Sequence, residues 1–350
     1  MKNKFIYAMI ITACCFFISF LSTSCSDWTD TESLTIIDPD IKKQNPELYA
    51  DYLQNLKEYR KSDHKIVYAW FDNSEKVPFN RAQHIDNLPD SIDVVVLTHP
   101  DSLDDLELNE IRNVRQDKDM KVIFSLDYDA LKLNYDNKMA ELKDNEEETT
   151  VQEDFLSHLL DTLGYSLKLV DTYGYDGIIV GYNGKSLLHM TANEKEEYIS
   201  NENTYIGIIH SWINTHKDKM LVFAGKPQNL VDKTILNLCK HIIIETSGAT
   251  SGGQLTYDIT RACTEGVPTD RFIVTAETTS LDQSDTKTGY WTDGTRAVPS
   301  SALWATATFP NFTIAGLGIY NINNDYYNVR RVYNYTKTAI YTLNPSFKSK

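Results

Sequence analysis

The chain has 350 residues, 41% of them hydrophobic and 24% charged, a composition typical of a packed globular protein rather than a disordered or fibrous one. Its formal net charge of −15 at pH 7 argues against nucleic acid as a partner, because phosphate binding requires clustered Lys and Arg. The length allows one large domain or two ordinary ones.

Residues 1–24 have the pattern of a secretory signal peptide. Lys2 and Lys4 precede the apolar run FIYAMIITACCFFISFL at 5–21, and small residues then lead to Cys25. The small residues before this cysteine resemble a bacterial lipobox, which predicts Cys25 as the lipidated first residue of the mature protein. A transmembrane anchor is the alternative interpretation of the apolar run.

Residues 25–44 are predicted to form a lipidated acidic linker. Asp27, Asp30 and Glu32 follow Cys25 closely and resemble the surface-export signal of Bacteroidetes lipoproteins. The resemblance implies an outer-membrane lipoprotein exposed at the cell surface; an ordinary solvated tether is the alternative. Because the chain is acidic, acyl chains rather than charge would hold it at a membrane.

The folded domain is predicted to span residues 45–350 and to begin with a helix, because Asn45 suits an N-cap and Pro46 the first helical position. Short apolar runs follow, and they are nearly continuous rather than alternating, which is typical of strands buried on both faces. The runs are 65–72, 92–99, 121–129, 176–183, 219–225, 241–247, 271–277 and 314–321.

Helical patterns separate these runs. They cover 102–118, 152–172, 193–215, 228–240, 253–265, 299–309 and 325–343. Eight strands alternating with helices predict a single-domain α/β fold, the (β/α)8 TIM barrel; a doubly wound sheet is the alternative. The charged segment 130–150 is expected to be a long connection, either a lid over a ligand groove or a solvated insertion.

The mature chain offers no metal-ligand spacing, and we expect no metal and no cofactor. Cys239 and Cys263 remain after the signal peptide; they either pair or stay as two buried thiols.

In a TIM barrel the ligand-handling residues stand at the carboxyl ends of the strands. The candidates found there combine aromatic rings, amides and carboxylates, which suit sugar rings and their hydroxyl groups. They are Trp70, Asp127, Tyr182, Asn183, Glu245, Glu277, Trp291, Tyr320 and Asn321. A phosphate loop, a dinucleotide turn and a Ser-His-Asp arrangement are not recognisable in the sequence.

The stretch YGYDGIIVGYN at 173–183 resembles the fourth-strand signature of glycoside hydrolase family 18, D-G-x-D-x-D-x-E, the family of chitinases and endo-β-N-acetylglucosaminidases. Asp176 and Gly177 match its opening pair. The two later aspartates fall on Ile179 and Gly181, and the glutamate falls on Asn183.

In the family, that glutamate protonates the leaving oxygen, and the third aspartate orients the N-acetyl group of the substrate as nucleophile. An amide at 183 has no proton to give, and Ile179 and Gly181 cannot hold the acetamide. The resemblance therefore implies a non-catalytic protein that captures N-acetylglucosamine-containing or N-glycan-type chains. It would pass them to an outer-membrane transporter and partner glycosidases.

Two alternatives remain open. In the first, the chain is an active glycosidase that uses relocated carboxylates such as Glu245 or Glu277, with Asp127 also near a strand end. In the second, it is a structural or protein-interaction lipoprotein that has lost the glycan site as well.

Overall fold

The computed structural model describes residues 41–144 and 154–345. The predicted signal peptide, Cys25 and most of the predicted linker lie outside these ranges. The chain divides into two units, residues 1–50 and 51–350. A short helix α2 (Ile41–Gln44) ends the predicted linker, and α3 (Pro46–Lys61) follows it. The side chain of Asn45 accepts a hydrogen bond from the Leu48 amide at 3.1 Å, which confirms the predicted helix start.

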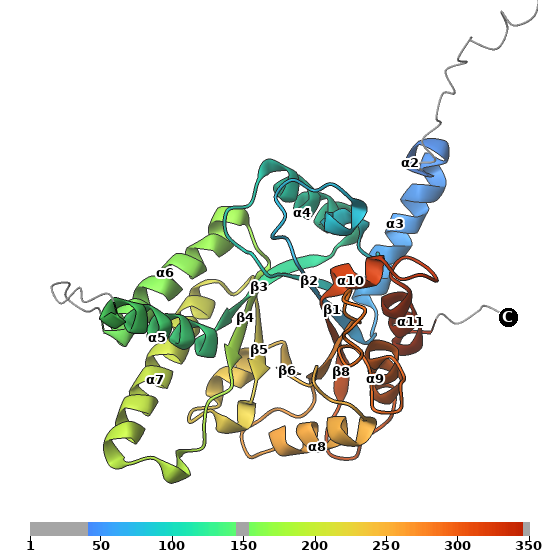
Figure 1. Cartoon of the computed structure of the whole chain (residues 1–350). Helices are drawn as coiled ribbons and strands as arrows, with labels where there is room; N and C mark the ends of the chain where they lie inside the picture. The colour runs from blue at the N-terminus through green and yellow to red at the C-terminus, as the bar shows by residue number, and fades with distance from the viewer. Residues whose placement is uncertain (1–40, 145–153, 346–350) are drawn as a thin grey trace, which may run out of the picture. The chain divides into compact units, whose positions relative to one another are not determined.

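Eight parallel strands close into a barrel in chain order (Figure 1). They are β1 (Ile66–Phe71), β2 (Val94–Leu97), β3 (Lys121–Asp127), β4 (Gly177–Tyr182), β5 (Met220–Gly225), β6 (His241–Ile244), β7 (Phe272–Glu277) and β8 (Ile314–Tyr320). Every strand falls inside a predicted apolar run. The single TIM barrel is therefore confirmed, and the doubly wound sheet is excluded.

Helices surround the barrel (Figure 1). They are α4 (Asp105–Lys118), α5 (Tyr128–Asp144), α6 (Phe155–Tyr173), α7 (Ala192–Thr215), α8 (Gly252–Ala262), α9 (Ala297–Ala305), α10 (Ile322–Tyr326) and α11 (Asn334–Leu343). Side-chain caps fix several of their starts, because the first amides of a helix have no partner within it. Asp104 and Glu107 form a capping box on α4, and Thr191 and Glu194 form one on α7.

Two apolar layers hold the barrel together. The larger lies between the strands and the helices, and the smaller fills the barrel interior. The interior layer consists of Tyr68, Trp70, Val94, Val96, Ile123, Ile179, Val222, Ala224, Ile243 and Ile273. Trp70, one of the predicted ligand residues, is 7% exposed and points into the barrel.

The predicted helix at 228–240 is wrong. The β5–β6 connection instead contains two 3-10 turns, Pro227–Asn229 and Thr234–Leu238. The amide of Val231 donates a hydrogen bond to Glu202 of α7 at 2.7 Å rather than to a helical carbonyl. Because Glu202 is remote in sequence, the apolar spacing alone could not reveal this competing partner.

The predicted helix at 325–343 is divided into α10 and α11. The buried carboxylate of Asp325 accepts hydrogen bonds from the amides of Tyr335 and Thr336 and from the Thr336 hydroxyl, so it caps α11. Tyr333 adopts a φ of +55°, which turns the chain back toward this cap.

The segment 130–150 is not the long loop that we expected, because α5 begins directly after β3 and covers most of it. The Asp127 side chain accepts a hydrogen bond from the Ala130 amide at 2.7 Å and caps this helix. Residues 145–153 of the segment lie outside the described part of the chain, and the predicted lid stays a prediction.

Cys239 and Cys263 are both free thiols and do not pair; Cys239 is buried as expected, whereas Cys263 is only partly buried. Burial raises the pKa of the Cys239 thiol to about 12, as expected for a structural rather than a reactive cysteine. Among the described residues, none of the helices has the length and apolar character needed to cross a membrane.

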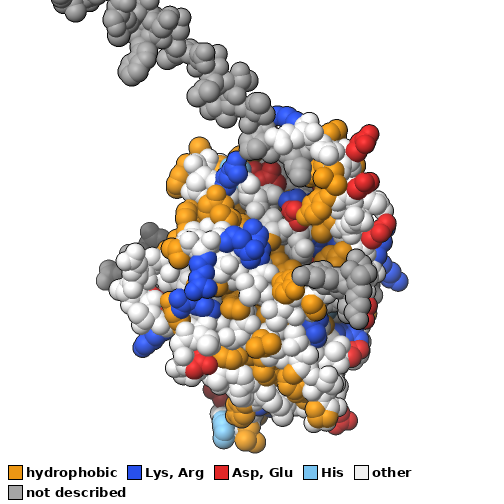
Figure 2. Space-filling model, turned by 90° about the vertical axis from the view of Figure 1, so that its right-hand side faces the viewer, with side chains coloured by type: hydrophobic (Ala, Val, Ile, Leu, Met, Phe, Trp, Pro, Cys, Tyr) orange, Lys and Arg blue, Asp and Glu red, His pale blue; other side chains and the backbone are white. Residues whose placement is uncertain are grey.

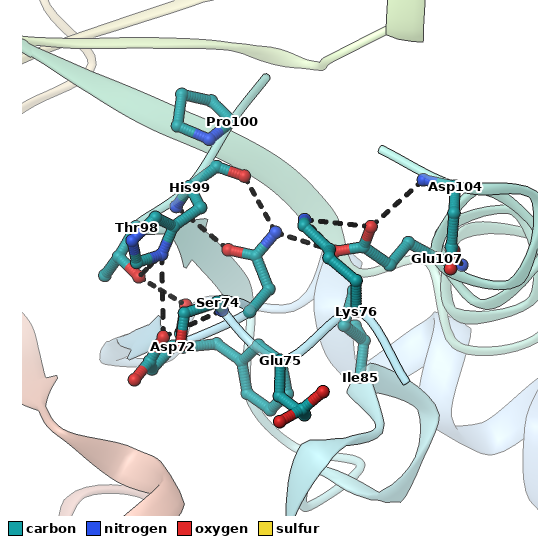
Figure 3. A network of polar contacts seen from close by, with 12 residues as sticks. Asp72, Ser74, Glu75, Lys76, Ile85, Thr98, His99, Pro100, Asp104 and Glu107 are labelled. Carbon is teal, nitrogen blue, oxygen red and sulfur yellow. Dashed lines mark hydrogen bonds and ion pairs between the residues drawn. The ribbon is translucent and has the colours of Figure 1, made fainter. Parts of the chain in front are cut away.

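A buried polar network fixes the loop after β1 to α4 (Figure 3). The Asn73 side chain is 4% exposed; it donates to Glu107 at 2.8 Å and exchanges hydrogen bonds with the backbone of His99. Glu107 also accepts from Lys76 at 3.0 Å and from the Asp104 amide. The network sets the position of the chain where it leaves β1.

We expect Glu107→Ala to lower the free energy of unfolding by about 2 kcal/mol, because it removes one of the two acceptors of the buried Asn73 amide and the acceptor of Lys76 and the Asp104 amide. Urea denaturation measures the change. Glu196→Ala removes the same side chain from an exposed position of α7 and should change stability by less than about 0.5 kcal/mol. Equal effects of the two substitutions would contradict a structural role for the network.

Candidate functional site

The strand with the family 18-like motif, β4, begins with two residues whose roles are structural. The Asp176 carboxylate accepts from Arg115 Nε at 2.7 Å and from the Val122 amide at 2.8 Å, which ties β4 to α4 and β3. Gly177 stands so close to the neighbouring strand that a Cβ would lie 2.7 Å from backbone atoms of Met220. The matched half of the motif therefore serves packing.

The other motif positions face the barrel interior without a carboxylate of their own. Ile179 is 1% exposed and belongs to the interior apolar layer. Gly181 lies beside Asp127 of β3: a Cβ at 181 would stand 3.0 Å from Asp127 Cα and Cγ and would collide with Oδ2. A carboxylate from the neighbouring strand thus fills the space next to Gly181.

Asn183 ends the motif strand in a polar setting. Its backbone N–H donates to the Asp129 carboxylate at 2.9 Å, and its backbone carbonyl accepts from the Asn229 side chain at 2.8 Å. Its side chain hydrogen-bonds to Glu245, the first residue after β6. The backbone of Asn183 is therefore held on both sides, and its side chain stands beside a carboxylate.

Tyr320 interacts with several of the predicted ligand residues. Its ring packs on Trp70 with centroids 4.2 Å apart and an interplanar angle of 35°. Loss of hydration raises the pKa of Tyr320, and the charges of Glu245, Asp127 and Glu277 raise it further. The structure therefore brings these residues together at the carboxyl ends of the strands.

Glu277, at the end of β7, accepts a hydrogen bond from Asn321 Nδ2 at 2.7 Å. Asn321 has a φ of +54° and begins α10. We call the whole group the mouth: Trp70, Asp127, Asn183, Glu245, Glu277, Tyr320 and Asn321.

Two predicted ligand residues lie elsewhere. Tyr182 is 1% exposed, and its hydroxyl contacts Glu202 at 2.6 Å and Tyr198 at 2.7 Å, so its side chain faces α7 rather than the mouth. Alternation along β4 explains this, because Gly181 faces inward. Trp291 is half-buried, with its ring 3.8 Å from where a Cβ on Gly252 would stand, at the start of α8. Trp304 of α9 is partly buried and packs against the apolar layer between the strands and the helices.

Sequence reasoning missed a pocket of about 350 Å³ beside the mouth. It is lined by Asn183, Gly225, Lys226, Gln228, Ile244, Glu245, Asp258 and Arg261. It also missed Ser125, an exposed residue within β3. Ser125 could have been recognised as the one uncharged polar residue in KVIFSL, two places before Asp127 on the same face. The pocket could not, because it depends on the 3-10 turns after β5.

The three carboxylates of the mouth all have raised pKa values. Loss of hydration raises the pKa of Asp127, Glu245 and Glu277, and the charge of Asp127 raises the pKa of Glu245 further. The hydrogen bond from Asn183 lowers the pKa of Glu245 and only partly offsets this. Such groups are able to hold a proton closer to neutrality than an ordinary carboxyl, a property that acid catalysis and ligand binding both use.

We expect Glu245→Gln to stabilise the folded state slightly at pH 7, because the Glu245 side chain is exposed and solvent screens part of the effect. A carboxyl whose pKa is raised by folding destabilises the protein once ionised, so this cost appears as the pH rises above about 4 through the folded pKa. The gain should therefore shrink as the pH is lowered toward 4. Urea denaturation across pH 4–7 measures it, with the exposed Glu196→Gln as the matched control. A gain that does not depend on pH would contradict the raised pKa.

One group of residues has metal-ligand chemistry, away from the mouth. Ligand atoms of His84, Asp86 and Glu110 lie within 4.8 Å of one another. The two Glu110 oxygens already contact His84 Nδ1 at 2.5 Å and the Ile85 amide at 2.8 Å. The protein itself satisfies this buried carboxylate, so the group is explained as a structural ion pair.

Comparison with known proteins places this fold and site in a family. Residues 29–342 match the family described as glycoside hydrolase family 18, BT1044-like. A solved Glu-to-Gln variant of BT1044 is 19% identical, with a TM-score of 0.59 over 88% of this chain and 97% of that one.

A second solved relative is the endo-β-N-acetylglucosaminidase of Cordyceps militaris. Its apo form is 17% identical, with a TM-score of 0.52 over 84% of this chain and 96% of that one. A double mutant of the same enzyme, solved with fucosyl-N-acetylglucosamine-Asn, matches with the same identity and TM-score. A comparison with curated proteins gave no match. The family match extends over most of the sequence, and the chain therefore belongs to the BT1044-like family of glycoside hydrolase family 18.

Proposed function

We propose that this protein binds N-acetylglucosamine-containing or N-glycan-type oligosaccharides at the mouth without hydrolysing them. The observation that carries the proposal is the state of the three motif positions. Ile179 is core, the space beside Gly181 is filled by Asp127, and Asn183 is a hydrogen-bonded amide. General acid catalysis requires a titratable proton at the glycosidic oxygen, and none of these three residues carries one.

The mouth retains what sugar binding requires. The Tyr320 ring supplies an apolar face with a polar hydroxyl, and the Trp70 ring packs against it. Asp127, Asn183 and Glu245 offer acceptors and a donor for hydroxyl groups. The family match and the solved enzyme with a bound fucosyl-N-acetylglucosamine-Asn support a glycan as the ligand class.

A glycan array followed by calorimetry tests this proposal. We expect binding to N-glycans or chitooligosaccharides, with the glycan unchanged after the titration. If the array shows no glycan bound, the second alternative, a structural or interaction lipoprotein, becomes the better account.

An active glycosidase is the competing function, and one observation favours it. Loss of hydration raises the pKa of Asp127, Glu245 and Glu277 at the strand ends, so one of them has the protonation behaviour of a general acid. In this account the carboxylates have moved to other strands while the chemistry has been retained.

Export and anchoring form a separate part of the proposal. The pattern of residues 1–25 supports a lipoprotein, which we place at the outer surface, beside an outer-membrane transporter and partner glycosidases. Cys25→Ala should release the protein from the membrane fraction, and protease added to intact cells should degrade the wild-type protein. Retention of the variant in the membrane would contradict lipidation.

A further inference from the structure

Acidic side chains predominate at the centre of the mouth. The charges that raise the pKa of Tyr320 are those of Glu245, Asp127 and Glu277, which stand at or directly after the ends of three different strands. Asp129 adds to the field at Glu245. Lys226 acts against these charges, and it lines the neighbouring pocket together with Arg261 and Glu245 itself.

Other parts of the surface carry both signs of charge. On the side of the molecule that carries α9 and α11, Lys and Arg side chains gather in the left half of the view, and Asp and Glu lie mostly along its margins (Figure 2). The carboxylates of the mouth stand at the converging strand ends instead, in a recess where water screens charges less than at an open surface.

Contacts of both carboxylate oxygens define the position of Asp127. Its Oδ1 is used as the cap of α5, where it accepts from the Ala130 amide. Its Oδ2 occupies the space beside Gly181, on the inward face of the barrel. Gly181 leaves room for this oxygen, and the α5 cap fixes the torsion of the side chain. The glycine and the aspartate therefore act as a matched pair that sets a negative charge in the mouth.

An anionic sugar would meet this field unfavourably. A sialic acid carboxylate brought near Asp127 and Glu245 would join two like charges, one of which already has its ionisation opposed by the other. A hexosamine with a free amino group would instead place an ammonium beside them, near the Tyr320 ring, whose pKa the charges of three carboxylates raise. The field thus separates ligands of the same ring shape by their charge.

We propose that the mouth selects its glycan by charge, preferring oligosaccharides with de-N-acetylated, cationic glucosamine over N-acetylated ones and excluding sialylated ones, with Asp127 as the specificity-determining residue. This inference rests on the proposed glycan-binding function of the same site. It adds the ligand class that the carboxylates recognise.

Calorimetry with three defined probes tests the proposal: glucosamine oligomers, N-acetylglucosamine oligomers of the same length, and a sialylated N-glycan compared with its desialylated form. Near neutral pH and at low salt we expect the cationic oligomer to bind about tenfold more tightly than the acetylated one. The sialylated glycan should bind at least about tenfold more weakly than its desialylated form. Raising the salt to 0.5 M should reduce both ratios.

Asp127→Asn identifies the residue responsible, because it keeps an oxygen for the α5 cap and removes the charge. It should bring the ratio between cationic and acetylated oligomers close to one. Asp218→Asn, the same change before β5 at the opposite end of the barrel, should leave the wild-type ratio. Equal binding of cationic and acetylated oligomers by the wild type, or an Asp127→Asn ratio equal to that of the wild type, would overturn the inference and leave the proposed function standing. Failure of every probe to bind would overturn both.

Discussion

Gly177→Ala is expected to prevent stable folding, with a loss of at least about 3 kcal/mol in the free energy of unfolding. A Cβ at this position would lie 2.7 Å from Met220 N and C and closer still to the Met220 carbonyl oxygen. These are backbone atoms of the adjacent strand, so no change of rotamer relieves the collision. Soluble yield and the urea midpoint of any recovered protein measure the effect.

Gly207→Ala is the matched control for this substitution. Gly207 lies exposed within α7, and a Cβ there would meet nothing within 4 Å. Alanine is the better helix former, so this variant should gain about 0.5–1 kcal/mol. A Gly177→Ala variant as stable as the wild type would show that β4 and β5 have more room than the structure gives them. The motif glycine would then need another explanation.

Tyr320→Ala is expected to weaken glycan binding by about 10- to 100-fold, because the ring is the aromatic surface at the centre of the mouth. The Tyr320 ring also packs against Trp70, which belongs to the apolar layer inside the barrel. A loss of about 1 kcal/mol in the free energy of unfolding should therefore accompany the change. Calorimetry with the glycan identified on the array measures binding, and urea denaturation measures stability.

Tyr320→Phe separates the two contributions, because it keeps the ring and removes only the hydroxyl near the three carboxylates. We expect it to retain most of the stability while losing part of the affinity. If Tyr320→Ala binds the glycan as tightly as the wild type, the sugar does not lie on this ring, and the binding site must be sought in another part of the chain.

The strands were predictable because their sequences are short and continuously apolar, a pattern that few other structures produce. The errors have identifiable causes. The expected helix after β5 does not form, because the Val231 amide donates to Glu202 instead, and the final helix is divided by the buried cap at Asp325. Such long-range partners leave no periodic signal in the sequence.

The site was only partly predictable for a similar reason. Strand ends identified the region, and the structure brings Trp70, Asp127, Asn183, Glu245 and Tyr320 together there. Tyr182 illustrates the limit: alternation along β4 assigns it to the helix side, although it is adjacent to two inward-facing positions. The pairing of Gly181 with Asp127 joins neighbouring strands, and it becomes visible only once their register is known.

The most direct test of the account is an overnight incubation of the purified protein with an N-glycoprotein and with chitooligosaccharides, followed by mass spectrometry. Binding without cleavage predicts that every glycan mass stays unchanged, as in a sample without protein. Released or shortened glycans would contradict the account if the reaction survives Asn183→Ala and is lost in Glu245→Gln. That result would assign the catalytic proton to the relocated carboxylates.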